Sequence, residues 1–290
     1  MMRSEDRALS VGVVVLTMGG RDAELASLAA SLAVPDDLAI DRVVVLNGGD
    51  ADLPAGWRGV RSETNLGVPG GRNLGIAEVR GDVVIILDDD AIVRSQDLIS
   101  RCIERFSEHP DLGALGFRIV VTGTNRSLRR WLPRIGSRGA DKAGDVTAFP
   151  GGAHALRRSA VDDVGGYRAE FFYALEETEL SWRLLDSGWR ILFEPGIFIE
   201  HPEHAITRHE DAARRTARNK VWLARLLLPA PLAVLYIALW IGLLVYRFRD
   251  FIPAVLSGAL SGLTALPGQR EPMSWRTVWV MTKLGRPPII

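Results

Sequence analysis

The run that most constrains this chain is Val83–Ala91, in which five apolar residues lead directly into three aspartates. Five consecutive apolar side chains are typical of a strand buried on both faces, as in a parallel sheet. The aspartates would then lie at the carboxyl end of that strand, where ligands bind in open α/β sheets. Adjacent carboxylates repel one another, and a bound divalent cation is the simplest reason to keep them together. An Asp-rich turn or helix start is the alternative.

Strand-like and helix-like segments alternate over the first 110 residues, which predicts a parallel α/β sheet. The expected strands are Leu9–Met18, Ile40–Leu46, Val60–Ser62 and Val83–Leu87, and the expected helices are Arg21–Leu32, the end of the glycine-rich loop to Arg80, and Ser95–His109. Further strands are expected at Ala114–Val121, Ile191–Phe193 and Ile197–Glu200.

Composition excludes several classes of protein. Lys plus Arg and Asp plus Glu both number 35, so no excess positive charge indicates a nucleic-acid partner. The single cysteine, Cys102, excludes an internal disulfide and a zinc site with several cysteines. The polar N-terminus and the short apolar run Val11–Met18 predict no signal peptide, so the α/β part is expected to stay in the cytosol.

Several motifs together resemble those of family 2 glycosyltransferases, and more narrowly those of the rhamnosyltransferase-like bacterial branch. In chain order they are Asn65–Gly75, Leu87–Asp90, Gly151-Gly152, Gly165–Tyr167, Glu176–Arg183 and His201. Each motif is weak alone, but their order and spacing over roughly residues 10–225 are specific.

The resemblance implies a GT-A fold: a mostly parallel twisted sheet flanked by helices, with a nucleotide-sugar half at about 9–110 and an acceptor half at about 111–207. It also implies an inverting, metal-dependent transfer from a nucleotide-sugar, with dTDP-rhamnose or a UDP-sugar as candidate donors. The acceptor would be a cell-surface glycan or its lipid-linked precursor.

By this resemblance, the metal would be Mg²⁺ or Mn²⁺ and would bridge the donor phosphates, neutralising the charge of the leaving diphosphate. Asp90 would ligate the metal, Asp88 would bind the metal or the nucleoside ribose, and His201 would complete the metal shell. The alternative for His201 is a structural loop residue before Pro202.

The acceptor hydroxyl must lose a proton, and a carboxylate opposite the leaving group can accept it. Glu177 matches the family's base position, and Glu176 is the next candidate. Their position at a helix start is expected to keep them ionised at neutral pH. Glu179, where relatives often have Asp, would orient the acceptor or pair with Arg183.

Other polar residues are candidate donor contacts. Asn47 and Asn65 lie at predicted strand ends and would face the nucleoside. Arg72, in a glycine-rich loop that allows close approach to a ligand, would neutralise the aspartates or simply pair with a carboxylate. Thr17 is a weaker candidate for a base contact, because Met18-Gly19-Gly20-Arg21 departs from the pair that follows it in relatives.

A long polar segment, Thr122–Asp145, is predicted to be an acceptor-side flap or a solvated linker. Its basic residues are Arg126, Arg129, Arg130, Arg134, Arg138 and Lys142.

Residues 208–290 are expected to form a basic and apolar helical tail that associates with the membrane. Leu226–Tyr246 carries no charge, and Pro229 and Pro231 place the start of regular helix near Ala230. The remaining helix is at the short limit for a span, and both of its flanks are basic, which favours shallow or re-entrant insertion at the cytoplasmic face. A single span, a buried helix and an oligomer contact are the alternatives.

Two other functions compete with glycosyl transfer. A nucleotidyltransferase that forms sugar nucleotides would share the α/β half, and Gly19-Gly20-Arg21 is suggestive, but no phosphate loop with a catalytic lysine follows. A non-catalytic, membrane-anchored glycan-binding protein would not need the intact acidic set.

Overall fold

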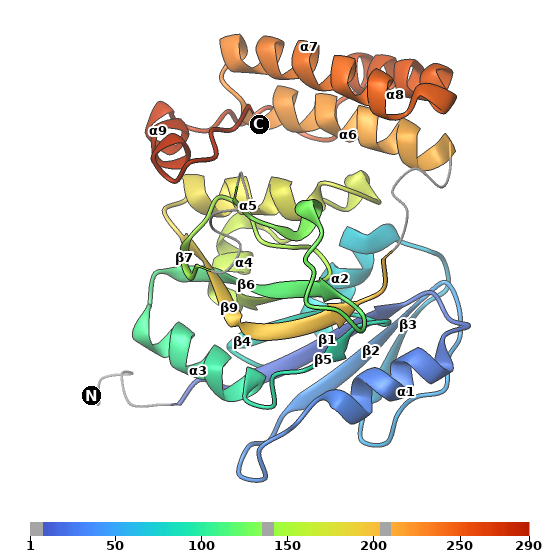
Figure 1. Ribbon diagram of the computed structural model, residues 1–290, viewed down its shortest axis with the longest axis vertical. Coiled ribbons are helices and arrows are strands. Elements are labelled where there is room, and N and C mark those ends of the chain that lie inside the picture. Colours follow the sequence, from blue (N-terminus) through green and yellow to red (C-terminus); the bar gives the residue numbers. More distant parts are fainter. Residues whose placement is uncertain (1–7, 135–141, 204–209, 290) are drawn as a thin grey trace.

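The structure is a computed structural model that describes residues 8–134, 142–203 and 210–289 (Figure 1). In this part of the chain nine strands form one sheet, in the order β3-β2-β1-β4-β8-β6-β9-β5, with β7 beside β9. The strands are β1 (Val11–Thr17), β2 (Asp41–Asn47), β3 (Arg58–Ser62), β4 (Val83–Asp88), β5 (Ile92–Val93), β6 (Leu112–Val121), β7 (Gly144–Asp145), β8 (Ala153–Arg157) and β9 (Arg190–His201).

Helices cover both faces of the sheet, as Figure 1 shows. On one face lie α1 (Asp22–Ser31) and α3 (Leu98–Glu108); on the other lie α2 (Gly67–Glu78), α4 (Arg158–Val164) and α5 (Glu176–Asp186). The alternating residues of β4 pack on both sides: Ile85 belongs to the core under α1 and α3, and Ile86 to the core under α2, α4 and α5. The predicted doubly buried strand before the aspartates is therefore confirmed.

The sheet is mixed, although its three longest pairings, β6 with β9 and β1 with both β2 and β4, are parallel. The prediction missed β8, a short strand that runs antiparallel between β4 and β6. It was wrong to divide β9 into two strands at Pro195-Gly196. The strand continues there because a register shift opposite Phe117 and Arg118 absorbs the irregularity.

The described part of the segment after β6 packs on the sheet through Leu128 and Trp131. It contains the short 3₁₀ helix η1 (Arg129–Trp131), and the buried Trp131 ring meets the His201 ring edge-on at 5.5 Å. A second 3₁₀ helix, η2 (Ala169–Phe171), precedes α5. The flap prediction falls partly outside the described residues, since Arg138 lies in the gap.

The tail consists of α6 (Glu210–Leu227), α7 (Ala230–Arg247), the 3₁₀ helix η3 (Arg249–Phe251), α8 (Ile252–Thr264) and α9 (Trp275–Lys283). Phe171 and Trp182 of the α/β part share a core with Trp222 of α6 and Tyr236 of α7. The predicted helix start at Ala230 is confirmed, whereas Arg208 and the N-terminal residues 1–7 lie outside the described part.

Within the described residues, α7 is the one helix that is long and apolar enough to cross a membrane by length and composition. Only 17% of its 18-residue apolar window is buried in the protein. Most of this apolar surface therefore faces away from the core.

Candidate active site

The site begins where three parallel strands end. Thr17, Asn47 and Asp88 are the last residues of β1, β2 and β4, and Leu16 pairs with Asp88 across the sheet. Carboxyl ends of adjacent parallel strands meet at one edge, so the strand pattern alone brings these side chains together. This edge is the one that the sequence predicted for the donor.

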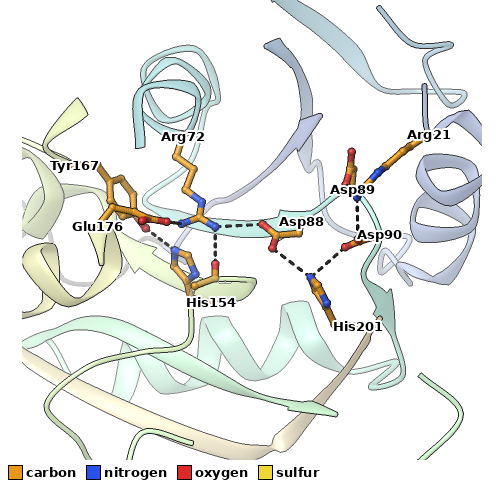
Figure 2. A network of polar contacts seen from close by, with 10 residues as sticks. Arg21, Arg72, Asp88, Asp89, Asp90, His154, Tyr167, Glu176 and His201 are labelled. Carbon is orange, nitrogen blue, oxygen red and sulfur yellow. Dashed lines mark hydrogen bonds and ion pairs between the residues drawn. The ribbon is translucent and has the colours of Figure 1, made fainter. Parts of the chain in front are cut away.

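Two of the three aspartates face one imidazole, which comes from the end of β9 (Figure 2). His201 Nε2 lies 3.1 Å from Asp90 Oδ1 and 3.4 Å from Asp88 Oδ2. Burial alone would lower the pKa of His201, but its contacts with Asp88 and Asp90 raise it to about 9. The two carboxylates are thus balanced by a positive charge at the point where they converge.

Arg21 supplies a second positive charge to the aspartates (Figure 2). Its Nη1 lies 2.9 Å from Asp89 Oδ1 and 2.8 Å from Asp90 Oδ2. Asp89 had no predicted role, and Arg21 was predicted only as part of the Gly19-Gly20-Arg21 turn that suggested a nucleotidyltransferase. The sequence feature that could have indicated this role of Arg21 is its position directly after the Gly19-Gly20 turn that ends the first strand.

Arg72 connects the aspartate edge to the acidic helix start. Its side chain is 2% exposed, and its Nη2 lies 3.2 Å from Asp88 Oδ1 and donates to the Gly151 carbonyl at 2.7 Å. Its Nη1 lies 3.1 Å from Glu176 Oε1. Burial opposes the charged form, but the neighbouring carboxylates raise the pKa of Arg72, so the guanidinium stays charged. Arg72 therefore pairs with a carboxylate on each side of the site.

A buried pair of side chains, His154 and Tyr167, lies next to the Arg72 guanidinium (Figure 2). His154 Nε2 and Tyr167 Oη are 2.6 Å apart, and the Tyr167 ring lies 5.8 Å from the Arg72 guanidinium carbon. The Asn73 amide exchanges two hydrogen bonds with the backbone of Tyr167, at 2.7 and 2.9 Å. Burial lowers the pKa of His154, so this imidazole is neutral. His154 was not predicted from the sequence as a site residue.

Gly151 and Gly152 separate the two sets of carboxylates. A Cβ atom on Gly151 would lie 3.5 Å from the Glu177 carboxyl carbon, and one on Gly152 would lie 3.0 Å from Asp88 Oδ2. The glycine pair thus has the aspartates on one side and the glutamate on the other. Side chains here would narrow the space between the two carboxyl groups.

The expectation that Glu177 is ionised at neutral pH was wrong. Burial and the neighbouring charge of Glu176 raise the pKa of Glu177 to about 8, and burial also raises the pKa of Glu176. The helix start does favour negative charge, but by less than the loss of hydration costs. A carboxyl group with a pKa near 8 can bind and release a proton near neutral pH.

The other side chains that were predicted to contact a substrate bind groups of the protein itself. Glu179 is 0% exposed and pairs with Arg183 at 2.6 Å and Arg168 at 3.1 Å, so the pairing alternative holds and acceptor contact is not supported. Asn47 is buried, and its amide accepts from Leu66 N–H at 2.8 Å.

Two further predicted contacts bind the local backbone. Asn65 is exposed, and its Oδ1 accepts from Gly67 N–H at 2.8 Å, while Thr17 Oγ1 accepts from Gly19 N–H at 3.1 Å. These residues therefore shape the loops of the edge, and their predicted nucleoside contacts stay predictions.

The Asp88 and Asp90 oxygens near His201 fit a cation that is also bound by the phosphates of a substrate. Among the described residues, no three His, Cys, Asp or Glu side chains form a complete protein metal site. Mg²⁺ is commonly held by one or two carboxylates together with substrate phosphates, so a complete protein site is not required. Asp88 and Asp90 each direct one oxygen to within 3.4 Å of the same nitrogen, and ligands about 3 Å apart can share one cation with bonds of about 2.1 Å.

Comparison with known proteins agrees with this geometry. Residues 34–165 match the family model described as Glycosyl transferase family 2. A curated relative, the pre-mycofactocin glycosyltransferase of Mycobacterium tuberculosis, is 28% identical over 205 residues, which cover 64% of this chain and 43% of the relative. This chain therefore spans less than half the length of that relative.

Two solved structures share the fold at 16% identity. The mannosyltransferase PcManGT from Pyrobaculum calidifontis, in complex with GDP-Man and Mn²⁺, has a TM-score of 0.57 and covers 96% of this chain and 80% of its own. GalNAc-T7 with UDP, GalNAc and Mn²⁺ has a TM-score of 0.55, and the match covers 68% of this chain and 44% of the GalNAc-T7 chain. Residues 34–165 thus resemble glycosyl transferase family 2, and the chain shares the GT-A fold of these two structures.

Proposed function

We propose that this protein is an inverting glycosyltransferase that moves a hexosyl group from a nucleotide-sugar to a glycan or lipid-linked acceptor. One observation carries the proposal: a single buried guanidinium, Arg72, pairs with Asp88 at 3.2 Å and with Glu176 at 3.1 Å. It holds a donor-side carboxylate and the acidic helix start on opposite sides of Gly151-Gly152. An inverting transfer needs these two groups on opposite faces of the sugar.

On the donor side, Asp88, Asp90 and the neutral form of His201 would hold Mg²⁺ or Mn²⁺ together with the donor diphosphate, and His201 would release its proton when the cation binds. When bound, the cation would stabilise the negative charge of the leaving nucleoside diphosphate. Arg21 and Arg72 hold the outer oxygens of these aspartates and so direct the inner oxygens toward one point. Donor binding therefore depends on two guanidinium groups that do not themselves need to touch the sugar.

On the acceptor side, Glu177 would accept the proton of the attacking hydroxyl. Glu176 is the weaker candidate, because it is buried and paired with Arg72. Glu177 is not paired with Arg72 and lies on the Gly151 side of the glycine pair. The proton moves from the acceptor oxygen to a Glu177 carboxylate oxygen as that acceptor oxygen bonds to the anomeric carbon of the sugar, and the bond from that carbon to the nucleoside diphosphate breaks.

The test is a donor panel of dTDP-rhamnose, UDP-sugars and GDP-mannose, with and without Mn²⁺, read as released nucleoside diphosphate. We expect one donor to release nucleoside diphosphate in a Mn²⁺-dependent reaction. Release of pyrophosphate instead would favour a nucleotidyltransferase. Unchanged glycan synthesis in cells that carry Asp90→Ala or Glu177→Ala would favour the non-catalytic glycan-binding alternative.

The tail supports a position at the cytoplasmic face of a membrane, with α7 and α8 lying in the plane of the lipid. The large apolar side chains exposed on the tail are Val234, Leu235, Leu239, Leu243 and Tyr246 on α7, Ile252, Leu256, Leu260 and Leu263 on α8, and Trp275, Trp279 and Val280 on α9. In Figure 1, α7 and α8 lie over α6, on the side away from the sheet. Their inner faces pack in a shared core, which supports shallow insertion over a span.

Flotation with phosphatidylcholine vesicles, with and without phosphatidylglycerol, tests this attachment. Leu239→Glu is expected to lower the bound fraction several-fold, because a charge in the lipid interface is costly. Leu53→Glu is the matched control, since Leu53 is 42% exposed and Leu239 is 44% exposed. Equal binding of both variants, or no binding of the wild type, would contradict membrane attachment.

A further inference from the structure

One residue of the tail reaches the turn that precedes the acidic helix. Asn219, on α6, is 0% exposed. Its side-chain nitrogen donates to three carbonyl oxygens, those of Phe171, Tyr173 and Ala174, at 2.9, 2.8 and 2.9 Å. An amide has only two N–H groups, so one of them is shared between two carbonyls. The amide oxygen accepts from Arg218 Nε at 3.1 Å, which directs the nitrogen toward the turn.

The turn itself, Phe171–Leu175, has an unfavourable backbone. Phe172 has φ 61° and ψ −47°, and the Tyr173 N–H donates to the Phe171 carbonyl at 2.6 Å, which is a γ-turn of the rare positive-φ kind. Ala174 and Leu175 follow with φ of 71° and 70°. Side chains of L residues rarely adopt these values, and such a backbone persists only where its surroundings hold it.

A second helix holds the turn from the donor side. The Val68 N–H, in the first turn of α2, donates to the Phe172 carbonyl at 2.7 Å. A Cβ atom on Gly67 would lie only 2.4 Å from that carbonyl oxygen, so the contact requires glycine there. The turn is therefore held between α2, which carries Arg72, and α6, which carries Asn219.

The residues next in the chain are the two candidate bases. Leu175 is the last residue before α5, and Glu176 and Glu177 are the first two residues of that helix. A change of φ at Ala174 or Leu175 would rotate the start of α5 and move both carboxyl groups. Figure 1 shows α6 lying along α5, which lets a residue of the tail act on this turn.

We infer that Asn219 is a positioning residue for glycosyl transfer: it holds the Phe171–Leu175 turn in the conformation that places the Glu177 carboxylate. This inference rests on the proposed function for its kinetic part only. It makes α6 part of the active-site structure, and not only a connection to a membrane-associated tail. Glycine in the turn should substitute in part for the amide, because glycine adopts positive φ without a steric cost.

Four full-length proteins test the inference: wild type, Asn219→Ala, the double variant Asn219→Ala with Ala174→Gly, and Arg225→Leu. Arg225 is the matched control, since it lies on the same helix and also donates to three carbonyl oxygens. Those carbonyls belong to the end of α8 and to Ala265, and not to the turn. The first measurement is hydrogen–deuterium exchange of peptides covering 171–179, which needs no substrate.

We expect Asn219→Ala to exchange faster than wild type over 171–179 while β1 and β4 stay protected, and Arg225→Leu to match wild type over 171–179. With the donor found by the panel, kcat should fall about 10- to 100-fold and the donor KM should change by less than about twofold, because a small displacement of a catalytic group costs this much. The double variant should recover part of the lost kcat.

Wild-type exchange over 171–179 together with wild-type kcat in Asn219→Ala would overturn the inference. Faster exchange throughout the sheet would also overturn it, since Asn219 would then support the whole fold. An equal loss of kcat in Arg225→Leu would do the same. If the wild type turns over no donor, the proposed function fails, and the exchange measurement still decides whether Asn219 holds the turn.

Discussion

The two sides of the site are built from different kinds of backbone. The aspartates follow a regular strand, β4, and three basic groups surround them: Arg21, Arg72 and His201. The glutamates follow a turn in which three residues, Phe172, Ala174 and Leu175, have positive φ, and each such residue costs on the order of 1–3 kcal/mol. The donor side is thus held by ion pairs, whereas the acceptor side combines one ion pair, between Glu176 and Arg72, with hydrogen bonds to a strained turn.

The difference extends to protonation. Although burial disfavours its charged form, contacts with His201 and Arg72 lower the pKa of Asp88, and the carboxylate stays ionised. Burial and Glu176 raise the pKa of Glu177 to about 8. A charged group suits a permanent role in binding, and a group that titrates near neutral pH suits proton transfer. The two acidic motifs of this chain are therefore not interchangeable.

The largest effect should follow removal of a donor-side carboxylate. Asp90→Ala leaves His201 and Arg21 without a shared partner and removes an oxygen for the cation. We expect turnover to fall by at least about 10³-fold, because a bound cation supplies several kcal/mol of charge stabilisation. The measurement is nucleoside diphosphate release at saturating Mn²⁺. A loss of less than tenfold would show that the aspartate edge is not the donor site.

Replacing the base should have the next largest effect. Glu177→Gln keeps the shape of the side chain but cannot accept a proton at neutral pH, so turnover should fall by about 10²–10³-fold. Glu176→Gln is the comparison variant, measured under the same conditions. If Glu176→Gln loses more turnover than Glu177→Gln without a loss of folding, the assignment of the base is reversed.

The pH dependence separates the two sides further. Glu177 acts as a base only when ionised, and its pKa is raised to about 8. The value of kcat/KM should therefore rise about tenfold per pH unit below pH 8 and level off above it. A profile from pH 5.5 to 9.5 at constant ionic strength checks this. A plateau that begins near pH 5 would mean that burial does not shift Glu177.

The same shift predicts a smaller effect on stability. A carboxyl group with a raised pKa in the folded state favours folding below its unfolded pKa, and this contribution is lost as pH rises. Glu177→Gln should therefore increase the free energy of unfolding at pH 8 by on the order of 1–3 kcal/mol, and by much less at pH 4. Urea denaturation at the two pH values measures the difference. A gain that is the same at both would rule out the ionisation of Glu177 as its cause.

The sequence predicted the position of the aspartates at the edge of the sheet well, for a clear physical reason. A run of buried residues such as Val83–Leu87 must be a doubly covered strand, and the residue after it must lie at the edge of the sheet. The same argument placed Thr17 and Asn47 at that edge. Arg21 was harder to predict, because a long side chain can turn toward several partners from a loop.

The acceptor side depended on contacts that are distant in the sequence. Helix-start chemistry predicts ionised glutamates, but Glu176 is buried and Glu177 lies against Gly151, and the loss of hydration has the opposite effect on their pKa. Asn219 gave no signal, since one asparagine in a basic amphipathic helix is ordinary. The positive φ values at Ala174 and Leu175 were equally hidden, because neither residue is a glycine.

The most direct test of the division between the two sides is calorimetric titration with UDP, GDP and dTDP in the presence of Mn²⁺, on wild type, Asp90→Ala and Glu177→Gln. If the aspartates bind the donor diphosphate and Glu177 serves the acceptor, Glu177→Gln will bind one of these nucleotides with a Kd within about twofold of wild type. Asp90→Ala will bind the same nucleotide at least about tenfold more weakly. Unchanged binding by Asp90→Ala, or lost binding by a folded Glu177→Gln, would contradict this division of roles.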